Sequence, residues 1–188
     1  MRGLALVVVA ALACGAPGVP AARAQGAAAG GRISALLQAL KNAPDGNVAH
    51  RIELRVRALW TEAGSPAAVL LEQRGVRDLV NHADQDALRA FDAALVIDPG
   101  YAACYGDRAI ARFRSGDIGG AIADIEAALR HDPRMFTVFD TLSRIAEARG
   151  DWRAALLAWR RYAEADPKGE GVQVRLRELE NKALGLKS

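Results

Sequence analysis

The sequence contains few aromatic residues, few cysteines and little excess charge. Aromatic residues make up 5% of the 188 positions, there are two cysteines, and the formal net charge is +3. Cores rich in strands are built mainly from β-branched and aromatic side chains, whereas alanine, which is abundant here, suits closely packed helices. The composition therefore predicts one folded domain of the all-α class.

Recognisable catalytic and metal-binding patterns are also lacking. His50, His82 and His131 fall on three separate predicted hairpins, so their spacing does not match a zinc site. There is no CxxC pair, no serine-centred elbow, and no lysine after the Gly119-Gly120 pair as a phosphate-binding loop requires. We predict no catalytic residue, no metal site and no cofactor, so the chain is not expected to be an enzyme. A metal-binding or hydrolytic protein is the alternative of another class.

The segment "NHADQD" at 81–86 carries enough oxygen and nitrogen atoms to suggest a metal loop. It lacks the glycine and the distal glutamate of a calcium-binding loop. We interpret it as a turn between helices in which Asn81 or Asp84 caps backbone groups.

Residues 1–24 have the order of a secretory signal peptide. Arg2 is followed by an apolar run from Leu4 to Leu12 and then by Ala22-Arg23-Ala24, a small-x-small cleavage site. The run is too short for a membrane span, which needs about 20 apolar residues. Cleavage before Gln25 would lower the net charge from +3 to +1 by removing Arg2 and Arg23. The mature chain would then lack the excess positive charge that nucleic-acid binding requires.

Export predicts a periplasmic or secreted location. A second interpretation is a lipoprotein anchored through Cys14, which follows "AALA". In the cleaved chain Cys104 is the single remaining thiol, so no internal disulfide can form, and we expect it to pack as a small apolar side chain.

An Asp-Pro pair occurs three times, at 98–99, 132–133 and 166–167, with 34 residues from one pair to the next. A residue before proline is excluded from the α region, so each pair is expected to end a helix. The spacing defines three units, 68–101, 102–135 and 136–169. Gly-Asp at 116–117 and at 150–151 supplies a left-handed residue and a helix cap for the turn inside two of these units.

Small residues recur where the two helices of each unit would cross, and a large side chain follows at an equivalent place. The small positions are Gly75, Ala87 and Ala94, then Ala109, Ala121 and Ala128, then Ser143 and Ala155; the large ones are Phe91, Ile125 and Trp159. With the 34-residue period, these features resemble the tetratricopeptide-repeat family, and in layout the chain is similar to small exported repeat proteins of Gram-negative bacteria. Two departures are "NHADQD" in place of Gly-Asp, and Tyr162 where a small residue is usual.

The resemblance implies an all-α, right-handed superhelical solenoid of antiparallel helix hairpins. Before the repeats we expect a flexible leader at 25–32, where "GAAAGG" lies, and an atypical hairpin at 33–67 with a turn at Pro44-Asp45-Gly46. After them, the amphipathic segment 170–188 is expected to form a capping helix and tail, because the terminal unit of a solenoid needs a polar outer face.

The first helix of each unit would line the concave side, where the family binds peptides. The residues expected to line this groove are Glu72, Val76, Asp107, Ile110, Phe113, Arg114, Asp140, Arg144 and Glu147. Glu72, Asp107 and Asp140 lie at or beside the places where some members use Lys, Asn and Arg to hold a peptide's C-terminal carboxylate, so that mode is not expected. We predict a non-catalytic scaffold or adaptor that binds a protein or peptide partner in the cell envelope. The alternative is a periplasmic chaperone or assembly factor for exported proteins.

Overall fold

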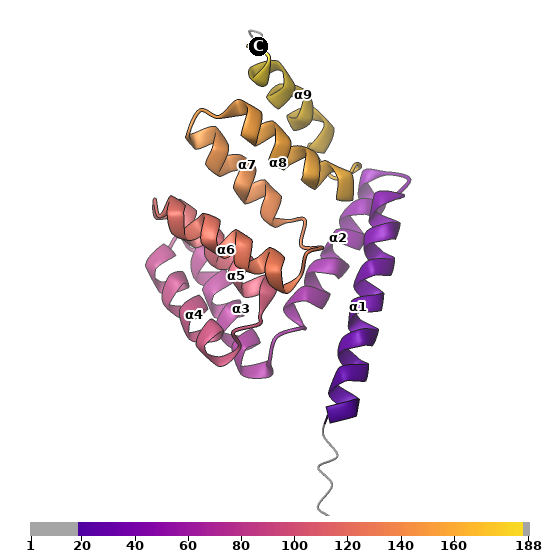
Figure 1. Ribbon diagram of the computed structural model, residues 1–188, viewed down its shortest axis with the longest axis vertical. Coiled ribbons are helices and arrows are strands. Elements are labelled where there is room, and N and C mark those ends of the chain that lie inside the picture. Colours follow the sequence, from indigo (N-terminus) through magenta and orange to yellow (C-terminus); the bar gives the residue numbers. More distant parts are fainter. Residues whose placement is uncertain (1–18, 186–188) are drawn as a thin grey trace, which may run out of the picture.

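The computed structural model describes residues 19–185, and it describes side chains from residue 30 onward. This part of the chain is all helical, as predicted (Figure 1). The helices are α1 (Val19–Lys41), α2 (Gly46–Thr61), α3 (Pro66–Val80), α4 (Asp84–Ile97), α5 (Ala102–Arg114), α6 (Ile118–His131), α7 (Val138–Ala148), α8 (Trp152–Ala165) and α9 (Val172–Ala183).

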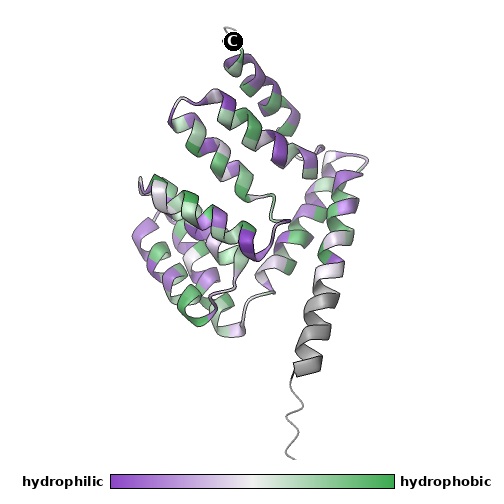
Figure 2. Cartoon of the chain, in the orientation of Figure 1, coloured by the Kyte–Doolittle hydropathy of each residue, from purple (hydrophilic) through white to green (hydrophobic). Residues whose placement is uncertain are grey.

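Three antiparallel pairs, α3 with α4, α5 with α6 and α7 with α8, are stacked in chain order. Neighbouring pairs are joined by packing of α4 against α5 and of both α5 and α6 against α7. Helix α9 packs against α8 at the end of the stack, with Val172 and Leu179 buried in that contact. In Figure 2 the apolar residues gather on the helix faces that meet inside this stack, because burial of these faces drives the pairs together.

The helix crossings are as close as the small residues predict. The predicted alanines, Ser143 and Gly75 are all buried. A Cβ atom built on Gly75 would come within 2.5 Å of the Phe91 ring, so this position has no room for a side chain. The prediction that small residues mark the helix contacts is confirmed, and so is the burial of Cys104.

Two of the three internal turns follow the predicted Gly-Asp pattern. Gly116 and Gly150 are left-handed, with φ of 84° and 72°, and Asp117 and Asp151 accept hydrogen bonds from backbone N–H groups of the following helix. In the first unit, His82 takes the left-handed position with φ 59°.

The expected cap at Asn81 or Asp84 is wrong. Helix α4 begins after Ala83 with no side-chain cap, and Asp84 instead forms a 2.8 Å ion pair with Arg114 of α5. A guanidinium from the next repeat is a stronger partner for this carboxylate than a single backbone N–H group.

The Asp-Pro pairs end helices as predicted. Helices α4, α6 and α8 stop at the residue before each aspartate, and Asp98, Asp132 and Asp166 lie outside the α region, with φ between −138° and −129° and ψ between 75° and 99°. The following prolines explain this geometry, because the pyrrolidine ring clashes with an α conformation in the preceding residue.

The first two helices form a hairpin that lies beside the stack (Figure 1). Helix α1 packs against α8, and α2 packs against α5, so the hairpin contacts more than one repeat. The predicted flexible leader at 25–32 is wrong, because α1 runs through this segment from Val19. Its alanines have the highest helix propensity of any residue and outweigh the glycines.

The signal-peptide prediction lies mainly outside the described residues, since 1–18, including Cys14, are not among them. Among residues 19–185, no helix combines the length and the apolar character that a membrane crossing needs.

Candidate functional site

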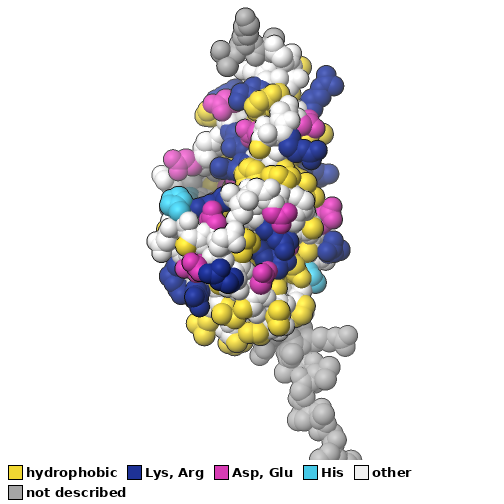
Figure 3. Space-filling view, turned by 90° about the vertical axis from the view of Figure 1, so that its left-hand side faces the viewer, with side chains coloured by type: hydrophobic (Ala, Val, Ile, Leu, Met, Phe, Trp, Pro, Cys, Tyr) yellow, Lys and Arg dark blue, Asp and Glu magenta, His cyan; other side chains and the backbone are white. Residues whose placement is uncertain are grey.

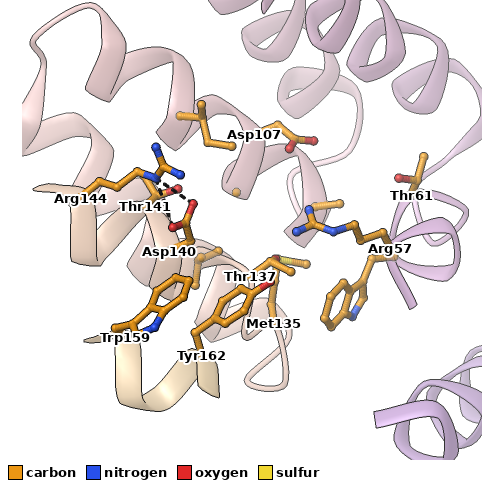
Figure 4. A pocket seen from close by; sticks show the side chains of 15 residues that line it. Arg57, Thr61, Asp107, Met135, Thr137, Asp140, Thr141, Arg144, Trp159 and Tyr162 are labelled. Atoms are coloured by element: carbon orange, nitrogen blue, oxygen red, sulfur yellow. Dashed lines mark hydrogen bonds and ion pairs between the residues drawn. The ribbon is translucent and has the colours of Figure 1, made fainter. Parts of the chain in front are cut away.

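A cavity of about 300 Å³ opens between the hairpin and the second and third repeats. Its walls come from the end of α2, from α5, from the loop before α7 together with α7 itself, and from α8. Figure 4 shows several side chains of these elements directed toward one space. Its lining residues include Arg57, Trp60, Asp107, Ile110, Met135, Val138, Asp140, Arg144, Trp159 and Tyr162.

Aromatic side chains hold α2 in place as one wall of this cavity. Trp60 packs against Phe136 with ring centroids 5.9 Å apart, and Phe136 meets the edge of Tyr162 at 5.1 Å. Tyr162 also stacks on Trp159 at 4.7 Å and donates a hydrogen bond of 3.3 Å from its hydroxyl to Glu53 of α2. Its position in the repeat usually holds a small residue. The large Tyr162 side chain fits there because it reaches out of the repeat to contact the hairpin.

Asp132, of the second Asp-Pro pair, ties the hairpin to the repeats. Its Oδ2 accepts hydrogen bonds from Trp60 Nε1 at 3.0 Å and from Arg134 Nη2 at 2.9 Å. Arg134 Nη1 donates in turn to the Gly30 carbonyl of α1 at 2.7 Å. Burial alone would raise the pKa of Asp132, but the hydrogen bonds from Arg134 and Trp60 favour the carboxylate and lower it.

Two ion pairs occupy the polar parts of the cavity wall. Arg144 Nε lies 3.0 Å from Asp140 Oδ2 within α7, and Arg57 Nη2 lies 2.8 Å from Glu53 Oε1 within α2. Asp107 lies on α5 between these two pairs, and in Figure 4 no dashed line joins it to either arginine. Within residues 30–185, Asp107 forms no salt bridge.

The structure brings four of the predicted groove residues into this cavity: Asp107, Ile110, Asp140 and Arg144. Glu147 lines an adjoining hollow together with Asp140 and Arg144, and it pairs there with Arg175 of α9 at 2.6 Å. Asp107 and Ile110 of α5 thus share one surface with Asp140 and Arg144 of α7.

The other four predicted residues do not line the cavity. Phe113 is half-buried and packs against the hydrophobic core. Arg114 is held by Asp84 and the Leu79 carbonyl at the turn of the first repeat. Val76 lies outside the lining on α3. Glu72 is buried, with only 3% of its surface exposed, and it lies behind Asp107.

The sequence pattern did not reveal that α2 and the aromatic residues help to form the cavity. Trp60 and Trp159 were interpreted as packing residues, and they are indeed buried, yet both also border the cavity. Tyr162 was the available signal, because a large residue at a position reserved for a small one indicates that an additional element packs there.

Charged side chains of both signs are intermixed on the face shown in Figure 3, and neither sign forms a large separate area there. Such a surface does not have the basic stripe of a nucleic-acid-binding protein.

The repeat architecture is shared with known proteins. A family model described as tetratricopeptide repeat matches residues 77–144, which run from the end of α3 through α4, α5 and α6 into α7. This part of the chain is thus similar to tetratricopeptide repeats. The chain is also similar to a TPR repeat-containing protein of Rhizobium etli. The two are 28% identical over 154 residues, which cover 82% of this chain and 76% of the other.

Two solved structures show the same fold as this chain. The first TPR of Spaghetti, bound to the HSP90 peptide SRMEEVD, is 20% identical with a TM-score of 0.60, over 65% of this chain and 99% of that one. The Sgt2 TPR domain from Aspergillus fumigatus is 24% identical with a TM-score of 0.58, over 64% of this chain and 81% of that one. The tetratricopeptide-repeat fold suggests a scaffold for protein–protein interaction.

Proposed function

We propose that this protein is an exported, non-catalytic adaptor that binds a protein partner in the cell envelope through the cavity between α2, α5, α7 and α8. The observation that carries this proposal is the cavity itself, in which aromatic and aliphatic walls surround a few charged groups. Sites that bind extended peptides have this combination, because apolar walls supply affinity and a few polar groups fix register.

Export is supported by the Arg2, Leu4–Leu12 and Ala22-Arg23-Ala24 pattern. The absence of a catalytic pattern in the sequence agrees with an adaptor. The neighbour that holds an HSP90 peptide supports peptide binding as a use of this fold.

A photo-crosslinking amino acid placed at Ile110 tests this function in the native envelope. Ile110 lines the cavity and is 37% exposed, so replacing it leaves the core intact. The control site is Val96 of α4, which is 81% exposed and does not line the cavity. We expect one discrete crosslinked product at Ile110 that is absent at Val96.

The other outcomes separate the alternatives. A broad set of exported chains captured at Ile110 would indicate a chaperone rather than an adaptor. Products at Val96 alone would assign binding to a different surface, and no product at either site would contradict the proposal.

A further inference from the structure

One face of α3 is left uncovered by the other described helices. Leu70, Arg74 and Arg77 follow one another at intervals of four and three residues, so they lie on the same face of this helix. Leu70 is 68% exposed, the side chain of Arg74 is 65% exposed, and Arg77 is exposed as well. A large apolar side chain therefore stands in solvent between two arginines.

The 34-residue period shows what this face does in the rest of the stack. The residues one, two and three periods after Leu70 and Arg77 are all buried, with at most 3% of their surface exposed. They are Cys104, Val138 and Val172 for Leu70, and Ala111, Ile145 and Leu179 for Arg77. The helix that precedes each of them in the chain packs alongside, α4 against α5, α6 against α7 and α8 against α9. The face is thus a helix-packing face on α5, α7 and α9, and on α3 it is uncovered.

The helix that precedes α3 in the chain lies elsewhere. Helix α2 packs against α1 and α5 and forms a wall of the cavity, and Figure 1 shows the hairpin at the side of the stack. The last unit is covered by α9, whereas the first unit has no such helix over Leu70. The end of a solenoid normally has a polar outer face, so an exposed leucine at this packing position points to a binding surface.

The contact between α4 and α5 shows what a covering helix supplies. Cys104 of α5 donates a hydrogen bond of 3.6 Å from Sγ to the Phe91 carbonyl of α4. Arg108, one period after Arg74, donates from Nη1 to Oδ1 of Asp92 on α4 at 2.7 Å. The covering helix therefore contributes close packing at the apolar position and a carboxylate to the arginine.

The arginines of α3 receive no such carboxylate. Arg74 lies 3.8 Å from Asp78, one turn further along the same helix, and an exposed pair of this kind contributes little. The side chain of Arg77 forms no ion pair within residues 30–185. Two positive charges beside a leucine are complementary to an acidic, amphipathic helix. They disfavour a second copy of this chain, because a two-fold contact would bring the same arginines of both copies together.

We propose that the α3 face formed by Leu70, Arg74 and Arg77 binds one amphipathic, acidic helix of a partner protein. An apolar side chain of that helix packs on Leu70, and a carboxylate pairs with the arginines as Asp92 pairs with Arg108. Because α3 does not line the cavity, this is a second surface, and it does not depend on the function proposed for the first. Two separate surfaces would let one adaptor join two proteins.

A library of one amphipathic helix displayed on phage, with its surface positions randomised, tests this proposal. Selections use the wild-type protein, the charge-reversed variant Arg74→Glu with Arg77→Glu, and the control Arg130→Glu with Arg153→Glu. Arg130 and Arg153 are exposed on α6 and α8, so the control changes the net charge equally. We expect Asp or Glu at a fixed position in helices selected by the wild type and the control. The charge-reversed variant should select Lys or Arg at that position.

Affinity measurements on the best helix selected by the wild type separate the charged and the apolar contributions. Charge reversal should weaken binding roughly 10- to 100-fold, and replacing the selected acid by lysine should restore binding to the reversed variant. Leu70→Ser should weaken binding by at least about 10-fold, because it removes the apolar contact. Leu70 is exposed, so this change leaves the core intact, and thermal melts establish that each variant is folded.

Three outcomes would overturn the proposal. Selected helices that bind equally well to the charge-reversed and Leu70→Ser variants would place binding on another surface. A library from which the wild-type protein enriches nothing over the phage background would show that this face does not bind such helices. A concentration-dependent dimer in sedimentation velocity that Leu70→Ser abolishes would assign the face to a second copy of the chain. The crosslink at Ile110 tests the cavity separately, so none of these results decides the proposed function.

Discussion

The indole Nε1 of Trp60 donates a hydrogen bond of 3.0 Å to Oδ2 of Asp132, and the two residues are 72 positions apart. This contact joins the N-terminal hairpin to the loop between the second and third repeats. It makes the hairpin one wall of the cavity, so the stability of the repeats and the shape of the candidate site depend on the same side chains.

Replacing Trp60 by phenylalanine should lower the free energy of unfolding by about 1 to 3 kcal/mol. The ring keeps much of its packing against Phe136, but Asp132 loses a donor in a partly buried place. Urea denaturation measures the change. The matched control is Trp152→Phe on α8, a half-buried indole whose N–H makes no such contact, and it should cost less. Equal losses for the two variants would contradict the role given to the Trp60–Asp132 bond.

Gly75→Ala should destabilise the first repeat by about 1 to 3 kcal/mol. The added methyl group would lie 2.5 Å from the Phe91 ring, so the two helices would have to separate. The same substitution at Gly119 in α6 meets no atom within 4 Å and should leave stability unchanged or raise it by about 0.5 to 1 kcal/mol. Thermal or urea melts of the two variants compare them directly, and similar signs for both would be inconsistent with this packing.

Glu72→Gln should become increasingly stabilising, relative to wild type, as the pH rises from 4.5 to 8. The pKa of Glu72 is raised from 4.5 to about 8, so between these values the unfolded chain loses a proton that the folded chain retains. The contribution of Glu72 to stability is complete below pH 4.5 and is lost as the pH approaches 8, at no more than about 1.4 kcal/mol per pH unit.

Urea melts at pH 5, 6.5 and 8 measure this difference, with the exposed Glu126→Gln as control. The control should differ from wild type by the same amount at every pH. A pH-independent difference for Glu72→Gln would mean that this carboxyl group ionises normally in the folded protein.

Arg134→Gln should loosen α1 without unfolding the repeats. Arg134 donates to the Gly30 carbonyl at 2.7 Å and to Ser34 Oγ at 2.9 Å, and it pairs with Asp132. Hydrogen exchange followed by mass spectrometry should be faster in α1 and unchanged in α5 and α6. Arg130→Gln, an exposed change on α6, serves as the control. Unchanged exchange in α1 would show that Arg134 does not hold the hairpin.

Export should be accompanied by cleavage between Ala24 and Gln25. Intact-mass measurement of the protein purified from the envelope decides the site, and Ala24→Leu should prevent or shift cleavage because the small-x-small pattern is lost. A diacylated chain beginning at Cys14 would replace this prediction with lipid anchoring.

Local features of the fold were predictable because each depends on residues close together in the sequence. The Asp-Pro pairs end α4, α6 and α8, and Gly116 and Gly150 adopt left-handed turns, since proline and glycine impose their geometry on immediate neighbours. The first-repeat turn could not be predicted in the same way. Asp84 binds Arg114 from the next repeat, and only the stacked arrangement brings that guanidinium within reach.

The sequence alone determined the helical repeat, its 34-residue period and the positions of the small residues, because these follow from propensity, spacing and short-range sterics. The tertiary structure decided where the N-terminal hairpin lies, and with it which residues face the cavity. Trp60, Asp132 and Tyr162 gain their roles from contacts between distant segments, which no local pattern encodes. The raised pKa of Glu72 is also a tertiary feature, because folding buries this carboxyl group and brings it near Asp107.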